Sequence, residues 1–585
     1  MKHIFTTRHK VFLDNYLVVE NDVDAMVQKQ VQPRRKRGRP EIAIENLENA
    51  SRRTKKRRLQ ELIDLEEKLK WDEGGPCEEI EDSTNTPHRS KSDLADRALA
   101  NFVDCRFTRN RYEMNRKFEI EITGESAHPS YYQLRKSKER CYPDGIEVTE
   151  TKASLDVQNL FDHTATRLVL TLPGEILDRI RGKILKLRIK WGMDGLSALT
   201  AFKQQWKNAE NNNNVSKQPL DSSLFMISMV PLMLVAEDDE IVWENPTPSS
   251  VKFCRPIQFE FVKETAANTT KEYEYYKSKI DNLQPCIMEK LGSEFRIYYE
   301  CQCTMIDGKT CNVLTGQKCC NNCNLCNAKP SQSNNANFVP DIPVNEEFYA
   351  FGMSPLHCRI RFLEHLFHVA CNMDFQQHKA QGEVLQVVRT ARKYMLQSSI
   401  KKHLKGLTID VVKTGYGTSN DGNTSRRFFE NPQETARVLG INERLVEMYK
   451  VFLEAINCTK QIDPVKMKKF SEEVMALYVS EYSWYPMPPS VHKAFMHGWQ
   501  IVERTSVPVG TLSEEAQEAT NKVVKRARLE NSRCYDRQSS NEDVLHYLLF
   551  ASDPLISSLR VGGEKTIKEL SPEAQSLMVD FQEAA

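Results

Sequence analysis

Alternating polar and apolar residues mark a strand in the first half of the chain. In KILKLRIKWGMDG (183–195), Lys186, Arg188 and Lys190 are polar, while the residues between them are apolar. A period of two is typical of a strand with one buried face. The pattern therefore predicts a strand that ends in a glycine-rich turn, with Asp194 in the turn.

Three more apolar runs predict buried strands, and the third of them ends at Asp307. They are LFMISMVPLMLVA (224–236), VKFCRPIQFEFVKE (251–264) and SEFRIYYECQCTMIDGKT (293–310). Residues 355–480 follow a mainly helical period, and a strong helix is expected over about 514–529. This mixture of strands and helices predicts an α/β fold.

The N-terminal part is more polar. A helix is predicted over 41–71, a linker over 72–92 and a renewed helix in DLADRALANFVDCRF (93–107). Eleven Lys or Arg against three Glu give residues 33–58 a local charge of +8, whereas the whole chain has a net charge of +1. A basic segment on a slightly acidic body is typical of a local grip on a polyanion.

Composition excludes several classes of protein. No apolar run approaches the roughly 18 residues of a membrane span, and the charged N-terminal stretch does not resemble a signal peptide. Sixteen cysteines in 585 residues do not indicate a disulfide scaffold, but nine of them fall within 254–326. That clustering indicates a metal site or buried thiols.

Two of the predicted strands end in the same Asp-Gly pair, at Asp194 and at Asp307. Two carboxylates at neighbouring strand ends could converge on one point, although Asp-Gly is also a common hairpin signal. Glu515 is a third candidate, because Ser513 is a plausible N-cap that places it in the first turn of a helix. Ordinary charge placement at a helix N-terminus explains Glu514, Glu515 and Glu518 equally well.

Four residues have the spacing of a metal site. Cys323 and Cys326 form a CxxC pair, and His492 and His497 lie 166 residues further along. Two thiolates and two imidazoles make a closed tetrahedral zinc site, which here would connect two distant segments. The neighbouring pair of cysteines at 319–320 competes for the same role, and all of these thiols could instead be small buried side chains.

Taken together and in order, these segments resemble the Transib transposases and the related catalytic subunit of the V(D)J recombination-activating recombinase. The resemblance runs from about residue 30 to 560. The matching segments are RGRP (37–40), RRTKKRRLQEL (52–62), WGMDGLS (191–197), TMIDGK (304–309), CNLC (323–326), SPLHCRIRFLEHLF (354–367), DGNTSRRFF (421–429), VHKAFMH (491–497), EAQEATNK (515–522) and RCYDRQSSNEDVLHYLL (533–549). The chain departs from the recombinase at Arg359, where the recombinase has an acidic residue.

The resemblance implies an RNase H-like catalytic core interrupted by a large, mainly helical, zinc-tied insertion. Five regions follow from it. They are an N-terminal DNA-end-binding region with linker (1–92), dimerisation or DNA-binding and pre-core helices (93–180), the core with the zinc cysteines (181–330), the helical insertion with the zinc histidines (331–500), and the catalytic glutamate helix with C-terminal helices (501–585).

The implied activity is that of a DDE-type DNA transposase, an endonuclease and strand transferase. It would nick transposon ends, form hairpins on the flanking DNA and join the excised ends to target DNA. Asp194, Asp307 and Glu515 would bind two Mg²⁺ or Mn²⁺ ions, and Cys323, Cys326, His492 and His497 a structural Zn²⁺. His357, Asn423 and Arg426 would lie near the active site.

The resemblance also implies partners. Terminal inverted repeats and target DNA would be bound as double strands, and the protein would act as a homodimer in the nucleus. Arg37 and Arg39 would enter an A·T-rich minor groove, and the basic helix would contact phosphates. The residues expected on DNA are Arg37, Gly38, Arg39, Pro40, Arg52, Arg53, Lys55, Lys56, Arg57 and Arg58. The same basic segment could instead be a nuclear localisation signal, and the two roles are compatible.

Two other functions compete with this one. A domesticated relative could have kept the fold and DNA binding but lost catalysis, and the intact acids argue against that alternative. A zinc-dependent chromatin or transcription factor would rest on the basic segment and the CxxC pair alone. That second alternative predicts no clustering of the three acids.

Overall fold

The computed structural model describes residues 91–197, 199, 221–290, 292–340, 343–379, 381–413, 417–561 and 569–580. The chain divides into two units, Met1–Asn85 and Thr86–Ala585, and every described residue belongs to the second. The predicted basic segment, the 41–71 helix and the DNA-binding residues from Arg37 to Arg58 therefore lie outside the described residues. Within the described ranges, none of the helices has the length and apolar character that a membrane crossing requires.

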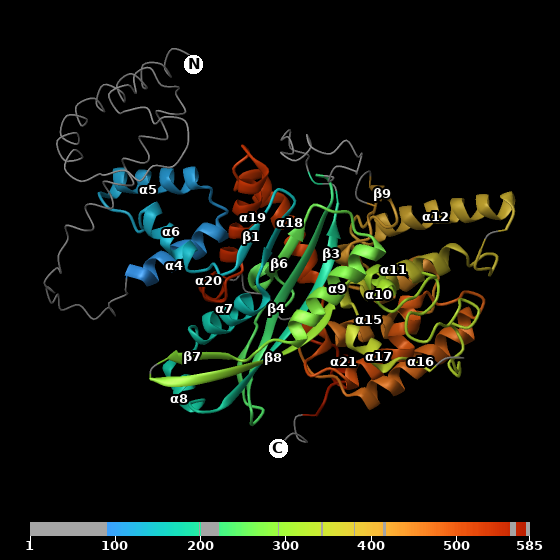
Figure 1. Cartoon of the computed structure of the whole chain (residues 1–585). Coiled ribbons are helices and arrows are strands. Elements are labelled where there is room, and N and C mark those ends of the chain that lie inside the picture. Colours follow the sequence, from blue (N-terminus) through green and yellow to red (C-terminus); the bar gives the residue numbers. More distant parts are fainter. Residues whose placement is uncertain are drawn as a thin grey trace, which may run out of the picture. The chain divides into compact units, whose positions relative to one another are not determined.

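A mixed sheet forms the centre of this unit (Figure 1). Its described strands follow the order β1-β2-β6-β4-β3-β8-β7, with β5 paired to β4. β3 (Ile184–Leu196) pairs antiparallel with β4 (Leu224–Ala236) and parallel with β8 (Ser293–Met305). The other strands are β1 (Ile146–Val148), β2 (Lys152–Leu155), β5 (Ile241–Glu244), β6 (Arg255–Glu260) and β7 (Cys286–Lys290).

The end of β3 differs from the sequence prediction. Asp194 lies inside the strand, paired with Met226, and the ladder continues until Leu196 pairs with Leu224. The Asp-Gly pair is therefore not a turn here, because a long partner strand extends the pairing past it. Gly192 lets β8 come close, since a Cβ built there would lie 2.1 Å from the carbonyl oxygen of Met305.

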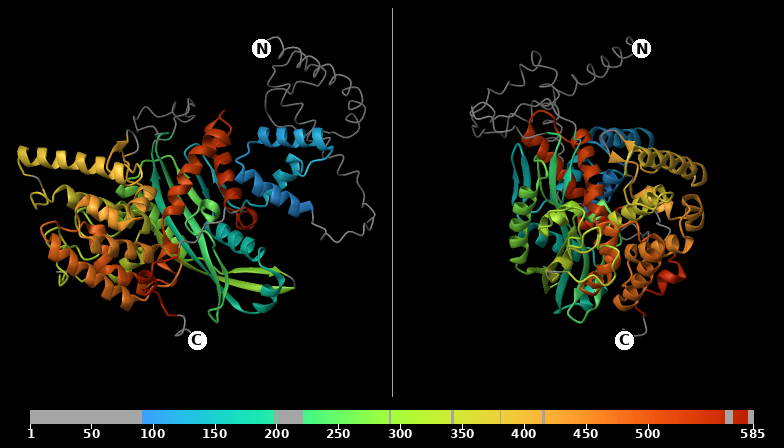
Figure 2. Two further views of the ribbon diagram at one scale, coloured as in Figure 1. Left: turned by 180° about the vertical axis from the view of Figure 1, so that it is seen from behind. Right: turned by 90° about the vertical axis from the view of Figure 1, so that its right-hand side faces the viewer.

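Helices cover both faces of the sheet, as two opposite views show (Figures 1 and 2). On one face Trp191 stacks on Tyr273 of α9 (Ala266–Asp281), with 5.8 Å between the ring centroids, and α7 (Val157–Val169) lies alongside. On the other face lie α18 (Glu515–Glu530) and α19 (Arg537–Ala551). Alternate residues of β3 thus face different helical layers.

The segment between β8 and α18 is mainly helical, as predicted, and it has its own apolar core. Its helices are α10 (Gly308–Leu314), η4 (Glu346–Phe351), α11 (Pro355–Cys371), α12 (Glu383–His403), α13 (Gly422–Phe428), α14 (Pro432–Leu439), α15 (Glu443–Asn457), α16 (Pro464–Tyr482), α17 (Pro489–Glu503) and η5 (Val509–Leu512). A small hairpin, β9 (Val412–Lys413) and β10 (Gly417–Thr418), interrupts them.

The region 93–180 was predicted to contain helices, and it also contains β1 and β2, which extend the sheet at one edge. Both strands are short, three and four residues, so they carry too little alternation to be predicted. The remaining elements are α4 (Lys91–Asp104), α5 (Arg109–Thr123), α6 (Tyr131–Glu139), α8 (Gly174–Arg179), η3 (Val251–Phe253), α20 (Pro554–Leu559) and α21 (Pro572–Gln575).

Candidate functional site

Asp194 and Asp307 line one open cavity of about 410 Å³. Asp194 comes from β3, and Asp307 follows the parallel strand β8 as the N-cap of α10, where its Oδ1 accepts from Thr310 N at 2.7 Å. Because β3 and β8 run side by side in the same direction, their C-terminal ends meet. The remaining lining residues are Met305, His357, Ile360, Lys413, Thr418, Asn420, Asp421, Glu514, Gln517 and Glu518.

The carboxyl group of Asp194 is held in place and surrounded by negative charge. Asn521 of α18 donates from Nδ2 to its Oδ2 at 2.7 Å. Burial and the nearby carboxylates of Asp307 and Glu264 together raise the pKa of Asp194 to about 7, although the hydrogen bond from Asn521 opposes the shift. A site in which several carboxylates disfavour one another's charge is one that a cation would stabilise.

Glu264 belongs to this acidic site, although the sequence pattern did not single it out. A Cβ built at Gly195 would lie 2.5 Å from Oε2 of Glu264, so this side chain rests directly on the residue after Asp194. Nζ of Lys309, two residues after Asp307, lies 2.9 Å from Oε1 of Glu264. Glu264 lies four residues after β6, at the end of the apolar run 251–264, and no local signal separates it from an ordinary polar residue after a strand.

Three glutamates at the start of α18 have different surroundings. Glu514 is buried and accepts from Nδ1 of His357 at 2.6 Å. Glu515 instead binds two arginines, Arg426 at 2.7 Å and Arg359 at 3.2 Å. Glu518 lines the cavity with both aspartates.

Helix geometry explains this difference. Glu518 and Gln517 lie three and four residues before Asn521, within about 60° of it around the helix axis, and so lie on the side of α18 that contacts Asp194. Glu515 is six residues before Asn521 and is turned by about 120° from that face. The N-terminus of α18 also differs slightly from the prediction, because Glu514 occupies the N-cap position and Ser513 Oγ accepts from Glu515 N at 3.3 Å.

The other predicted active-site residues lie around the same region. His357, in the first turn of α11, lines the cavity. Burial lowers the pKa of its imidazole, but the hydrogen bond and charge of Glu514 outweigh burial, and the net shift is upward. Arg426 of α13 does not line the cavity. It donates hydrogen bonds to Oδ1 of Asn423 at 2.9 Å and to Oε1 of Glu515.

Several buried polar atoms beside the cavity have no hydrogen-bond partner among the described residues. They are Oε2 of Glu514, Nε2 of Gln517 and Oδ1 of Asn521. An unsatisfied buried polar atom costs free energy, so natural proteins rarely leave one without a water or ligand. Three such atoms beside two aspartates support a polar ligand in this cavity.

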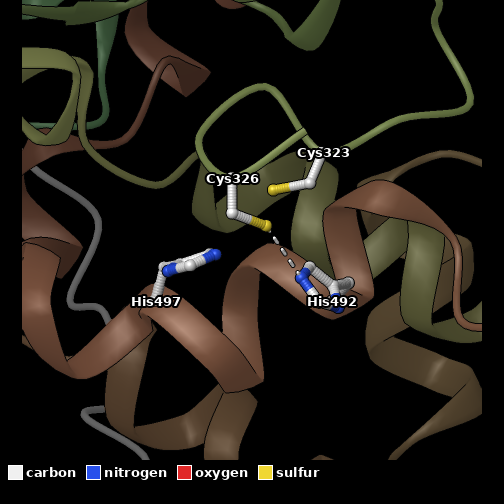
Figure 3. A group of neighbouring side chains, drawn as sticks. All are labelled: Cys323, Cys326, His492 and His497. Atoms are coloured by element: carbon white, nitrogen blue, oxygen red, sulfur yellow. Dashed lines mark hydrogen bonds between the residues drawn. The ribbon is translucent and has the colours of Figure 1, made fainter. Parts of the chain in front are cut away.

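A second site consists of Cys323, Cys326, His492 and His497 (Figure 3). All four side chains are buried, and one ligand atom from each lies within 4.8 Å of the others. The cysteines come from the loop after α10, whereas both histidines come from α17. The sequence prediction that these two distant pairs meet is confirmed, and the cluster could hold a metal ion such as zinc.

The details of this cluster fit a metal. Nδ1 of His492 lies 2.8 Å from the carbonyl oxygen of Ser333, and Nδ1 of His497 lies 3.1 Å from Oε1 of Gln500. These contacts fix both rings with Nε2 directed to the cysteines, and Nε2 of His497 has no partner among the described residues. A hydrogen bond from Cys326 holds the pKa of the Cys323 thiol well below its usual value.

The alternative ligands, Cys319 and Cys320, are exposed and lie outside the group of four.

Comparisons with known proteins add little to this geometry. No family model matches the chain, and no curated protein matches its sequence. Among solved structures, the Drosophila P element transposase strand transfer complex is similar over 84% of this chain and 99% of that chain, with 9% sequence identity and a TM-score of 0.31. A TM-score this low establishes neither a shared fold nor a shared function.

Proposed function

We propose that the chain is a cut-and-paste DNA transposase of the DDE type with an RNase H-like core. One observation carries the proposal: carboxylates from β3, from the β8–α10 junction and from α18 line a single cavity. The strand order supports it, since a central strand with an antiparallel neighbour on one side and a parallel one on the other brings two strand ends to the same edge. The rival zinc-dependent transcription factor predicts no such clustering.

The acidic cavity suits hard cations with oxygen ligands. Bound there, two Mg²⁺ or Mn²⁺ ions would supply the charge neutralisation and water activation that phosphoryl transfer requires. Asp194, Asp307 and Glu264 would be ligands, together with a glutamate of α18. The resemblance implies that Glu515 is this ligand, whereas the geometry of α18 favours Glu518.

Other residues of the cavity would act on the DNA. Asn521 orients the carboxyl of Asp194 through their hydrogen bond. Glu514 holds Nδ1 of His357, so the imidazole would present Nε2 to a phosphate oxygen. Arg426, half-exposed, would make bidentate contacts with a phosphate once it exchanges Glu515 for DNA.

The finer steps and partners rest on the resemblance and are part of the same proposal. The protein would nick transposon ends, form hairpins on flanking DNA and join the freed ends to target DNA. It would do so in the nucleus, as a homodimer, with end recognition by the basic N-terminal segment. The Cys/His cluster would carry a structural Zn²⁺ that ties the insertion together.

The test is cleavage of a labelled duplex that carries the element's own terminal repeat, in Mg²⁺ or Mn²⁺. Asp194→Asn and Asp307→Asn should abolish nicking but leave binding of the duplex nearly unchanged, because the cations act after docking. Asp178→Asn, an exposed aspartate on α8, is the matched control and should nick normally. Wild-type protein that binds the duplex without nicking it would indicate the catalytically retired relative instead.

A further inference from the structure

A fully buried lysine connects the strand that carries Asp194 to the helix that carries the glutamates. Lys190 lies in β3, four residues before Asp194 and on the same face, and its side chain is 0% exposed. Its Nζ donates to the carbonyl oxygen of Thr511 at 2.7 Å and to that of Ser513 at 2.6 Å. Both acceptors are backbone atoms immediately before α18.

These two carbonyl groups belong to the short segment that leads into α18, so their positions determine the direction in which the helix starts. Thr511 belongs to η5 and Ser513 follows it, so two donated hydrogen bonds fix the backbone just before the first helical residue. From the other side, η5 packs on the end of α15, because a Cβ built at Gly510 would lie 2.1 Å from the carbonyl oxygen of Cys458. The η5–α18 junction is therefore held between the sheet and the helical segment.

Packing alone does not explain a lysine at this position. Burying an ammonium group costs several kcal/mol, and an apolar side chain of similar volume is often at least as stabilising. Burial lowers the pKa of Lys190 to about 7, with partial compensation from Cys254, Glu514 and Glu515. A costly buried group that sits between two parts of an acidic site indicates a functional requirement.

We propose that Lys190 is a positioning residue for the cation site: it holds α18 at the distance and angle from β3 at which the α18 carboxylate and Asp194 bind the same ions. The inference rests on the proposed function in that the cavity is taken to bind divalent cations. It adds a residue that touches neither cation nor DNA.

The experiment measures binding of Mn²⁺ to the full chain by electron paramagnetic resonance, beside the melting temperature and the nicking rate. Lys190→Met removes the donors and keeps the volume. Its dissociation constant for Mn²⁺ should rise about tenfold or more, as for other residues that orient metal ligands. The control is Lys186→Met on the same face of β3, where the side chain is 54% exposed and 3.7 Å from Glu300, and Mn²⁺ binding should not change.

The outcomes separate the two levels of the proposal. A folded Lys190→Met protein that binds Mn²⁺ and nicks like the wild type, even with a lowered melting temperature, would reduce Lys190 to a structural role and overturn the inference alone. If Lys190→Met does not fold, Lys190→Gln keeps a shorter, uncharged N–H donor group. A dissociation constant for Mn²⁺ that is raised in this variant would support the inference, and one equal to that of the wild type would overturn it. Wild-type protein that binds no Mn²⁺ in this cavity would overturn both the inference and the proposed function.

Discussion

Glu515 and Glu518 are three residues apart, yet they have opposite electrostatic partners. Glu515 is neutralised by Arg359 and Arg426, whereas Glu518 lines the same cavity as Asp194 and Asp307. At this scale, the two arginines that pair with Glu515 decide which glutamate is available to a cation.

Glu518→Gln should therefore reduce nicking roughly 100-fold or more, because it removes a proposed cation ligand. Glu515→Gln should reduce it less, because Glu515 is already paired with Arg359 and Arg426, and should not weaken DNA binding, because Arg426 no longer has to leave an anionic partner for a phosphate. The measurement is the single-turnover nicking rate at saturating Mn²⁺, with duplex binding measured in parallel. The reverse order of effects would return the third ligand to Glu515, as the resemblance implies.

Binding of cations should depend on pH through Asp194. Burial and neighbouring carboxylates raise its pKa to about 7, so below that pH a proton competes with the cation for the same oxygens. Mn²⁺ affinity should fall by up to about tenfold per pH unit below about 7 and level off above about 8. A titration of Mn²⁺ binding against pH tests this expectation.

In Asp194→Asn the residual Mn²⁺ affinity should lose most of that slope, since an amide does not titrate. An unchanged slope in the variant would assign the pH dependence to another carboxylate of the cavity.

At the scale of elements, sequence patterns identified the parts with strong local periodicity. The apolar runs of β3, β4 and β8 and the helix α18 were all predicted, and the segment 355–480 is helical as expected. The position of Asp194 within β3 was missed, because strand length here depends on pairing with β4, which no local pattern encodes. Glu264 was missed for the same kind of reason, since its place depends on contact with Gly195.

The Cys/His cluster joins a loop to a helix, and a zinc ion bound there should be needed to keep them together. Cys326→Ser should lose zinc and lower the melting temperature, because the remaining three ligands bind far more weakly and α17 loses its attachment to the loop. Cys319→Ser, an exposed thiol outside the group, is the matched control and should keep its zinc. Zinc is measured by atomic emission on the purified chain, and full retention in Cys326→Ser would contradict the site.

For the whole molecule, the proposed reaction requires two transposon ends to be cut together. A symmetric homodimer offers two equivalent cavities for two ends. Light scattering with end DNA should give a particle with two protein chains, and the paired ends should be nicked with equal rates. A particle with one chain, active on an isolated end, would contradict the dimer.

The arrangement of the Cys/His cluster also sets an order in time. At roughly 5–20 residues per second, a ribosome that has made Cys326 needs on the order of 10–30 s to reach His492, which is 166 residues further along. During that interval the two thiols are present without the imidazoles that complete the site. A disulfide that closed in that interval would remove both thiolates from the proposed zinc site before its histidines exist.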